Sequence, residues 1–470
     1  MMMYHGNYNM FMFGCMILVT VRLLSVSMVS SFSIRQQSHH GVCQLSLLFA
    51  SNQNSNNNVD IAWDTHEMTV SLLSKRNKKK NPRWKFQRTN PSPISYENVT
   101  YSYSYDELHL IHPEKRIQKT FGMILIHPIG IGIGKWYYHR LLSSLFHNYY
   151  YNQNHTTGTS TMDFNLHVIS PDLVGSGTSR INPHPSNTTL TTTAATKNDI
   201  PPPLWNISDW TFQINHLITT LQQQQQSIDS WIIVANGGCS PIALQVLQQS
   251  LLQNNNITIS HLLLSSIPRL SFFLPTSSSI NQEKVQRSYK RLCGIIGKIF
   301  WWYSLRNNGK FIQKFSERNL VADPSNLGST WTSNCLTTAK LNKQWNQYST
   351  FAFLAGTLQD GCHSSLHTII SSSSYQTNPT QFGFVYGRDQ RRNRAKSWFW
   401  KKQTKTQNHH SDNNNNNMTL YNYLQINGYP YLQEYYVGGR ISLAHEDSDG
   451  YSKALLSLIS SNATNHTTSP

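Results

Sequence analysis

The chain has 470 residues, of which 38% are hydrophobic and only 13% are charged, and its formal net charge is +17. This length leaves room for one large α/β domain beside an N-terminal targeting region. The six cysteines are scattered without a CxxC pair, which argues against a disulfide framework or a zinc ribbon. The basic excess comes without a recognisable nucleic-acid-binding fold, so nucleic acid is not expected as a partner. We also expect no metal and no cofactor, because no metal-ligand cluster, phosphate loop or dinucleotide-binding glycine pattern occurs.

The N-terminal region has the composition of a targeting sequence. The first acidic residue is Asp60, and the apolar stretch 10–21 is too short to span a bilayer comfortably, as in a signal peptide. Small residues, Phe32 and a Ser-, Gln- and Asn-rich segment follow. This order resembles the bipartite presequence of algae with complex plastids. The resemblance implies a signal peptide over 1–31, a transit peptide and disordered linker over 32–83, and import into the plastid stroma, with secretion as the alternative.

The first ordered elements are expected from about Trp84 onward. Tyrosine and valine alternate with polar residues over 99–105, which predicts a strand of an antiparallel edge hairpin. The continuous apolar run 123–126 predicts a strand that is buried on both faces. It leads into a turn rich in glycine, 127–134, and then into a helix.

The next predicted strand, 165–170, ends at a turn that contains Asp172. We expect this carboxylate to brace the turn rather than take part in chemistry. Three polar segments rich in Asn, Thr or Gln are expected to be surface loops, at 150–161, 181–200 and 403–417.

The most informative stretch joins a strand to a helix through glycines. A β-branched apolar run, 230–236, breaks at a glycine pair and resumes at helical spacing over 240–247. This stretch resembles the nucleophile elbow of the α/β-hydrolase fold, whose pattern is small-x-nucleophile-x-small. The resemblance puts Gly237 at the position of the nucleophile, with Ala235 and Cys239 as its small neighbours.

The resemblance covers about 84–460, followed by a disordered tail at 461–470. It implies an α/β fold with a mostly parallel sheet flanked by helices. It also implies a helical cap inserted after the strand that follows the elbow, at 270–375, where amphipathic helices and tryptophans are predicted. The remaining predicted elements are strands at 260–268, 381–389 and 431–437 and helices at 204–221 and 449–460.

A hydrolase of this fold needs a nucleophile, and Gly237 has no side chain to supply one. Cys239 and Ser240 are the nearest candidates, and a thiol close to a helix N-terminus has a lowered pKa. By resemblance, the backbone donors of the oxyanion hole would be Ile129, Gly130 and Gly238.

The acid and the histidine of a triad also depart from the pattern of the family. Asp389 is the nearest acid to the expected position, one residue away from it. Counting back from Glu446 to the expected position of the histidine gives Ile441, whereas His445 is displaced by about one helical turn.

We therefore predict a catalytically degenerate α/β-hydrolase-fold protein that binds an apolar or amphipathic small molecule or acts as a scaffold. The alternative is an active serine- or cysteine-type hydrolase for an ester or lipid-like substrate, with Cys239 or Ser240, His445 and Asp389 as its triad. A third reading is proton-transfer or lyase chemistry through His127 or His445.

Peripheral membrane contact is a further expectation about partners. The segment 398–402 combines three aromatic residues with two lysines, a composition suited to a membrane surface as well as to helix packing. The sequence gives no expectation for the oligomeric state.

Overall fold

All the residues that the structure describes belong to the unit Trp63–Pro470. The computed structural model describes residues 63–76, 95–111, 119–155, 164–181, 205–224, 227–252, 257–268, 270–273, 282–341, 346–358, 362–373, 379–389 and 418–465. The predicted signal peptide 1–31, most of 32–83, the segment 398–402 and the loop 403–417 lie outside these residues.

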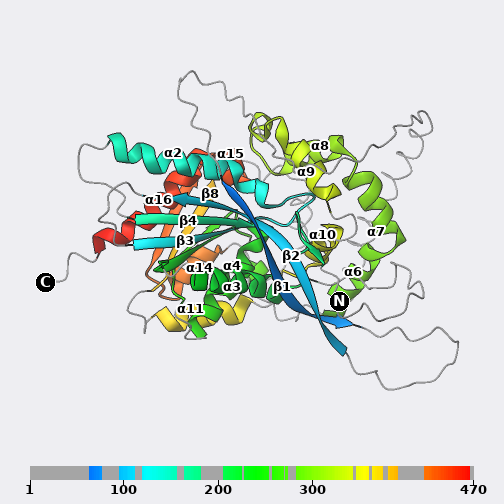
Figure 1. The fold of residues 1–470 in the computed structure, drawn as a ribbon, viewed down its shortest axis with the longest axis horizontal. Coiled ribbons are helices and arrows are strands. Elements are labelled where there is room, and N and C mark those ends of the chain that lie inside the picture. Colours follow the sequence, from blue (N-terminus) through cyan, green and yellow to red (C-terminus); the bar gives the residue numbers. More distant parts are fainter. Residues whose placement is uncertain are drawn as a thin grey trace, which may run out of the picture. The chain divides into compact units, whose positions relative to one another are not determined.

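One mixed sheet forms the centre of the described part of the chain (Figure 1). Its strands follow one another in the order β1-β2-β4-β3-β6-β7-β8-β9, and the short β5 pairs with β2. Each predicted strand is present, with bounds that differ by a few residues. The strands are β1 (Asp64–Arg76), β2 (Ser95–Leu110), β3 (Lys119–Ile126), β4 (Phe164–Pro171), β5 (Arg180–Ile181), β6 (Ser230–Asn236), β7 (Ile259–Ser265), β8 (Gln381–Gly387) and β9 (Leu432–Val437).

The six strands from β4 to β9 in this order are parallel, whereas β2 runs antiparallel to β1 and to β4. Strands β3, β6, β7 and β8 are buried almost throughout, as expected for continuous apolar runs covered on both faces. Because the strands are parallel, the turns that follow them meet at one edge of the sheet, which we call the carboxyl edge.

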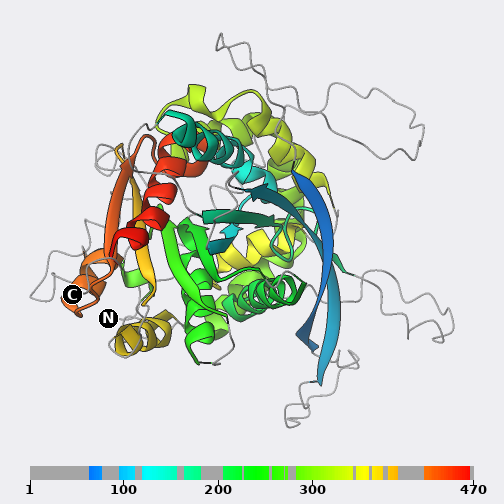
Figure 2. The same cartoon turned by 60° about the vertical axis from the view of Figure 1, so that its left-hand side comes forward.

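Helices cover both faces of the sheet (Figures 1 and 2). Helices α2 (His139–His155), α15 (Leu443–Glu446) and α16 (Ser448–Asn465) lie together on one face. Helices α3 (Ile207–Gln224), α4 (Ser240–Leu252), α11 (Cys362–Ser373) and α14 (Leu420–Ile426) cover the other and share a single hydrophobic core with it. The predicted helices at 204–221 and 449–460 are α3 and α16. No helix of the described residues combines the length and apolarity needed to cross a bilayer.

The described residues between β7 and β8 are mainly helical. They form α5 (Leu270–Phe273), α6 (Gln282–Cys293), α7 (Ile295–Ile299), the π-helix η4 (Phe300–Leu305), α8 (Gly309–Asn319), the 3-10 helix η5 (Pro324–Leu327), α9 (Thr330–Lys340), α10 (Asn346–Ala355) and α11. Figure 1 shows α6 to α9 grouped at one end of the sheet, whereas α11 lies with α3 and α4. The predicted boundary 270–375 therefore includes one helix, α11, that belongs to the layer on the sheet, because its apolar face packs on α4.

The prediction of a disordered linker over 32–83 is wrong for its last part, because β1 occupies Asp64–Arg76. Figure 2 shows β1 and β2 as a long curved pair at one edge of the sheet. The inward residues Val70 and Leu72 are buried, while Thr69 and Ser71 are exposed. This alternation is typical of a strand with one polar face. The segment forms a strand because it pairs with β2, which lies further along the chain.

Two other boundaries also need correction. Helix α2 continues to His155, into the predicted loop 150–161, because Tyr149 is buried and its hydroxyl donates to the carbonyl of Phe164. Helix α16 continues to Asn465, into the predicted tail 461–470, where the hydroxyl of Ser461 donates to the side chain of Gln381 at 3.1 Å.

The packing of β3 on β6 gives a test of the fold. Gly122 pairs with the fully buried Trp231, and a Cβ on Gly122 would lie 2.5 Å from the indole ring. We expect Gly122→Ala to lower the free energy of unfolding by about 1–3 kcal/mol through overpacking, measured by urea denaturation. In a Trp231→Leu background the same alanine should cost much less. An equal cost in both backgrounds would contradict the packing described.

Candidate active site

The turn after β6 has the geometry of the predicted elbow. Strand β6 ends at Asn236, the 3-10 helix η3 (Gly237–Cys239) makes the turn, and α4 starts at Ser240. Gly237 has a φ of +58°, in the left-handed region where any residue with a Cβ is strained. Among the described residues, one heavy atom lies within 4 Å of a Cβ built on Gly237, the carbonyl oxygen of Ser266 at 3.9 Å. The apex of the turn therefore has room for a side chain but carries none.

The order of the strands decides the fold. Strand β2 is antiparallel to its neighbours β1 and β4. Strands β3 and β4 exchange places, so that β4 lies between β2 and β3, and β6 follows β3 in the sheet. The sharp glycine turn comes directly after β6. The chain has the α/β-hydrolase fold. The sharp turn at Gly237 lies between β6 and α4, where the sequence analysis expects the elbow.

Solved structures of this fold resemble the chain at low sequence identity. A peroxisomal α/β-hydrolase of Saccharomyces cerevisiae matches with a TM-score of 0.46 and 12% identity over 87% of this chain and 90% of its own. A loop variant of a haloalkane dehalogenase from Bradyrhizobium elkanii matches with a TM-score of 0.42 and 10% identity over 85% and 100%. A thermophilic esterase from Thermogutta terrifontis matches with a TM-score of 0.41 and 9% identity over 83% and 98%. No protein-family model and no curated protein sequence matches the chain.

The two candidate nucleophiles do not have the surroundings of a nucleophile. Cys239 is completely buried, and burial raises the pKa of its thiol to about 12, although the backbone of Ile129 hydrogen-bonds the sulfur. The expected lowering by the helix N-terminus is therefore wrong, because desolvation of the thiolate is the larger effect. Ser240 is also buried, and its hydroxyl donates to the carbonyl oxygen of Gly237 at 2.8 Å. Neither side chain faces the open apex.

His445 is held in an aromatic environment. Its Nε2–H donates to the carbonyl oxygen of Leu327 at 3.0 Å, and its Nδ1 is buried without a hydrogen-bond partner among the described residues. Its ring lies edge-on to Trp331 and stacks near Tyr137, with centroid distances of 4.5 and 6.4 Å. Burial, with a smaller effect of the Arg140 charge, lowers its pKa to about 4. The ring is therefore neutral at pH 7, and a backbone carbonyl already binds its N–H.

Ile441 instead lies beside the elbow. Its carbonyl oxygen accepts hydrogen bonds from the hydroxyl of Ser266 and from the side-chain Nδ2 of Asn236, the latter at 3.5 Å. Its amide donates to the carbonyl oxygen of Leu320 at 3.1 Å, which fixes the loop after β9. Ile441, the residue that the count from Glu446 reaches, thus lies in the loop after β9 with its backbone bound to the two sides of the elbow.

Asp389 follows β8 and lies next to the same loop, since its amide donates to the carbonyl oxygen of Gly439 at 3.3 Å. Among the described residues, no hydrogen bond or ion pair joins the Asp389 carboxylate to His445. The structure therefore brings the Asp389 backbone, Ile441 and Gly237 to the carboxyl edge, but it does not assemble the predicted Cys239, His445 and Asp389 into a triad.

The candidate oxyanion donors lie at the same edge. The backbone of Ile129 hydrogen-bonds the Cys239 thiol. The carbonyl oxygen of Gly130 accepts from the hydroxyl of Thr350 at 3.1 Å, and a Cβ on Gly238 would lie 2.7 Å from the ring of Phe353. The helical segment between β7 and β8 thus covers the turns on which an oxyanion hole would be built.

His127 and Asp172 brace the turns after β3 and β4. His127 is completely buried, its Nδ1–H donates to the carbonyl oxygen of Pro128 at 2.9 Å, and its Nε2 accepts from the amide of Leu173 at 3.0 Å. Because both ring nitrogens bind backbone groups, the ring cannot reach a substrate in this arrangement. Asp172 accepts from the amides of Lys135 and Thr178, each at 2.8 Å, which confirms its predicted bracing role.

Two features of the site escaped the sequence analysis. Ser266 has a φ of +50°, which is uncommon for a residue with a Cβ. Its hydroxyl donates to the carbonyl oxygen of Ile441, and its own carbonyl oxygen faces the apex at Gly237. Phe353 reaches Gly238 from a helix more than 100 residues further along the chain. Neither has a local sequence signal, because each depends on contacts between distant segments.

The buried His445 predicts a pH dependence of stability. An unfolded histidine has a pKa of about 6.5, so the unfolded chain binds a proton between pH 6.5 and about 4 that the folded ring does not bind. The free energy of unfolding should therefore fall as the pH is lowered through this range, by roughly 1.4 kcal/mol for each pH unit. In His445→Gln this part of the slope should disappear, while the part due to the similarly buried His261 remains. Urea denaturation between pH 4 and 7 measures both slopes, and equal slopes would contradict the assignment.

Proposed function

We propose that this chain is an α/β-hydrolase-fold protein without nucleophilic catalysis, which binds a small apolar or amphipathic molecule at the elbow. The observation that carries the proposal is the pair formed by Gly237 at the apex and Ile441 beside it. A hydrolase of this fold needs a nucleophile at the first position and a proton acceptor at the second. The buried thiol of Cys239 gives no substitute.

The surroundings of the apex support an apolar ligand. Gly237 and Gly238 are both partly exposed, and the ring of Phe353 lies against Gly238. Ile441 is 37% exposed beside them. Apolar walls around a few backbone polar groups are typical of small-molecule sites. The ligand would bind beneath the helical segment that covers the carboxyl edge, as a substrate does beneath a cap.

Restoring the two lost groups tests the catalytic part of the proposal. We expect Gly237→Ser alone to fold, at a cost of about 1–2 kcal/mol for the left-handed backbone, and to hydrolyse p-nitrophenyl esters no faster than the unmodified protein. The double variant Gly237→Ser/Ile441→His should gain labelling by a fluorophosphonate probe, because Asp389 lies beside the same loop.

The unmodified protein provides the decisive comparison. It should show neither ester turnover nor specific labelling of Cys239 by iodoacetamide in the folded state, since that side chain is buried. Turnover by the unmodified protein that is lost in Cys239→Ala or Ser240→Ala would overturn the proposal and establish the hydrolase alternative.

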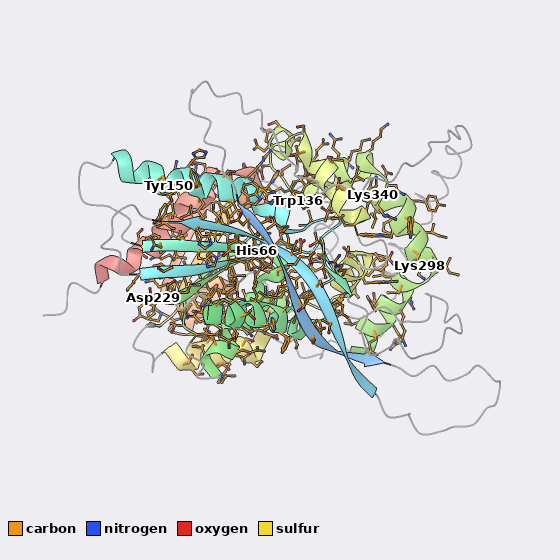
Figure 3. All side chains as sticks on the ribbon, in the orientation of Figure 1. His66, Trp136, Tyr150, Asp229, Lys298 and Lys340 are labelled. Atoms are coloured by element: carbon orange, nitrogen blue, oxygen red, sulfur yellow. The ribbon has the colours of Figure 1, made fainter. Side chains whose placement is uncertain are left out.

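A second candidate function is contact with an anionic membrane surface. On α7 and η4, Ile295 is 78% and Tyr303 is 72% exposed, and Trp302 is exposed beside them. Lys298 lines, together with Trp302 and Tyr303, a hollow of about 310 Å³. Figure 3 shows Lys298 on the side of the helical segment that faces away from the sheet. Exposed aromatic and aliphatic side chains beside lysine are typical of interfacial helices.

The charge around these residues supports the same partner. Residues 284–318 contain nine lysines and arginines and one acid, Glu317. The guanidinium of Arg306 lies 4.1 Å from the centre of the Trp302 ring. A juxtamembrane cation contributes about 1 kcal/mol of attraction to an anionic bilayer. The exposed apolar residues and the cations would therefore act together.

Sedimentation with vesicles tests this contact. We expect binding to vesicles of phosphatidylglycerol and phosphatidylcholine, and little binding to phosphatidylcholine alone. Trp302→Ala/Tyr303→Ala should weaken binding by at least about tenfold, because burial of a large side chain is worth about 1.5–3 kcal/mol. Phe212→Ala, at an exposed aromatic residue on α3, is the matched control and should bind normally. Equal binding by both variants would exclude this surface.

A further inference from the structure

A cluster of imidazoles surrounds a carboxylate on β2, away from the elbow. Glu107 and His109 lie two residues apart on β2, so both side chains point to the same face of the sheet. His167 on β4 is the direct cross-strand partner of His109 in the antiparallel pair. The register of two strands therefore brings three potential metal ligands together, although β4 lies two strands from the elbow strand β6.

The ligand atoms converge. The Nε2 atom of His109 lies 3.0 Å from Oε1 of Glu107, and Nε2 of His167 contacts the same oxygen. All three ligand atoms lie within 4.8 Å of one another. The two imidazoles stack with a centroid distance of 4.3 Å and an angle of 12°, so both rings present Nε2 on the same side. A tetrahedral ion with bonds of about 2.0–2.1 Å holds neighbouring ligand atoms roughly 3.3 Å apart, a spacing that small side-chain shifts would reach.

We propose that Glu107, His109 and His167 form a binding site for one divalent metal ion, with zinc as the preferred ion. Two imidazole nitrogens and one carboxylate oxygen are ligands that suit zinc better than calcium or magnesium. Three protein ligands leave one coordination position for water. The half-exposed His109 gives access from solvent, whereas His167, at 2% exposure, fixes the inner side of the site.

The half-exposed His66 on β1 binds the second oxygen of the Glu107 carboxylate. Its Nε2 lies 2.8 Å from Oε2 of Glu107, the oxygen that the metal would leave unused, and its ring stacks on Tyr105 at 5.2 Å. Figure 3 marks His66 on the β1–β2 pair. A hydrogen bond of this kind orients a ligating carboxylate and typically changes metal affinity 10–100-fold.

The neighbouring carboxylate provides a contrast. Asp106 points to the opposite face of β2, where it pairs with the ammonium of Lys135 and with Nε2 of His139 at 2.8 Å. An ammonium group neutralises a carboxylate but cannot ligate a metal. The two acids of β2 are therefore adjacent in sequence, but the groups that surround Glu107 are metal ligands, whereas those around Asp106 include a fixed cation.

Calorimetric titration of the full chain with Zn²⁺, and visible spectroscopy with Co²⁺, test the site. We expect His109→Asn, at a half-exposed side chain that can be replaced without disturbing the core, to lower the number of tightly bound Zn²⁺ ions by one. The same variant should lose the absorption bands of tetrahedral Co²⁺. His66→Asn should keep the ion but weaken its binding about 10–100-fold.

His139→Asn is the matched control, because it removes a histidine of α2 that pairs with Asp106 on the opposite face of β2, and it should bind Zn²⁺ as the unmodified protein does. Glu107→Gln, checked for folding by circular dichroism, should behave like His109→Asn. The proposal is wrong if His109→Asn and the unmodified protein bind the same number of Zn²⁺ ions with the same affinity, or if Co²⁺ shows only the weak bands of octahedral coordination.

Discussion

The sharp turn at Gly237 is the constraint on which the carboxyl edge depends. Strand β6 is buried along its whole length, and α4 must start immediately after it to pack on the same sheet. A backbone that reverses so abruptly passes through positive φ, which costs a residue with a Cβ about 1–2 kcal/mol. An enzyme accepts this strain because it exposes the nucleophile. A glycine makes the same turn without the strain, so this turn is compatible with our proposal that the chain lacks nucleophilic catalysis.

The groups around the turn use their polar atoms for structure. The carbonyl oxygen of Ile441 ties the loop after β9 to Ser266 and Asn236, and the thiol of Cys239 is closed off inside the core. His445 faces Trp331 and a backbone carbonyl instead of the apex. These contacts are mutually consistent, since none of them leaves a nucleophile or a proton acceptor facing the apex. They explain why we favour ligand binding over hydrolysis at this edge.

Strand β2 shows how pleating separates two chemistries that are adjacent in sequence. Side chains alternate between the faces of a strand, so Asp106 and Glu107 enter different environments although one peptide bond joins them. Lysine from the turn after β3 reaches Asp106, whereas histidines from β1, β2 and β4 reach Glu107. The antiparallel β2 thus carries both a structural ion pair and a proposed metal site, far along the chain from the elbow.

Local patterns determined most of the fold. The apolar runs of β3, β4, β6, β7 and β8, the glycine pair at the elbow and the helical spacing after it are all short-range signals, so the strands, the turn and the absence of a nucleophile at Gly237 could be predicted from the sequence. The interpretation of Ile441 as the residue at the histidine position needs only a count from Glu446, and it stays a prediction. By contrast, β1 lies in a polar segment whose strand character depends on pairing with a partner more than 20 residues away.

Only the tertiary structure decided which side chains meet. Whether Cys239 has a lowered or a raised pKa depends on burial, and a helix start in the sequence says nothing about that. The sequence shows that His445 follows the last strand, but it does not show that the imidazole ring lies against Trp331. The sequence analysis predicted no metal, because no metal-ligand cluster is visible along the chain. His167 joins Glu107 and His109 through strand register across some 60 residues, and such pairings are set by packing of the whole sheet rather than by any local pattern.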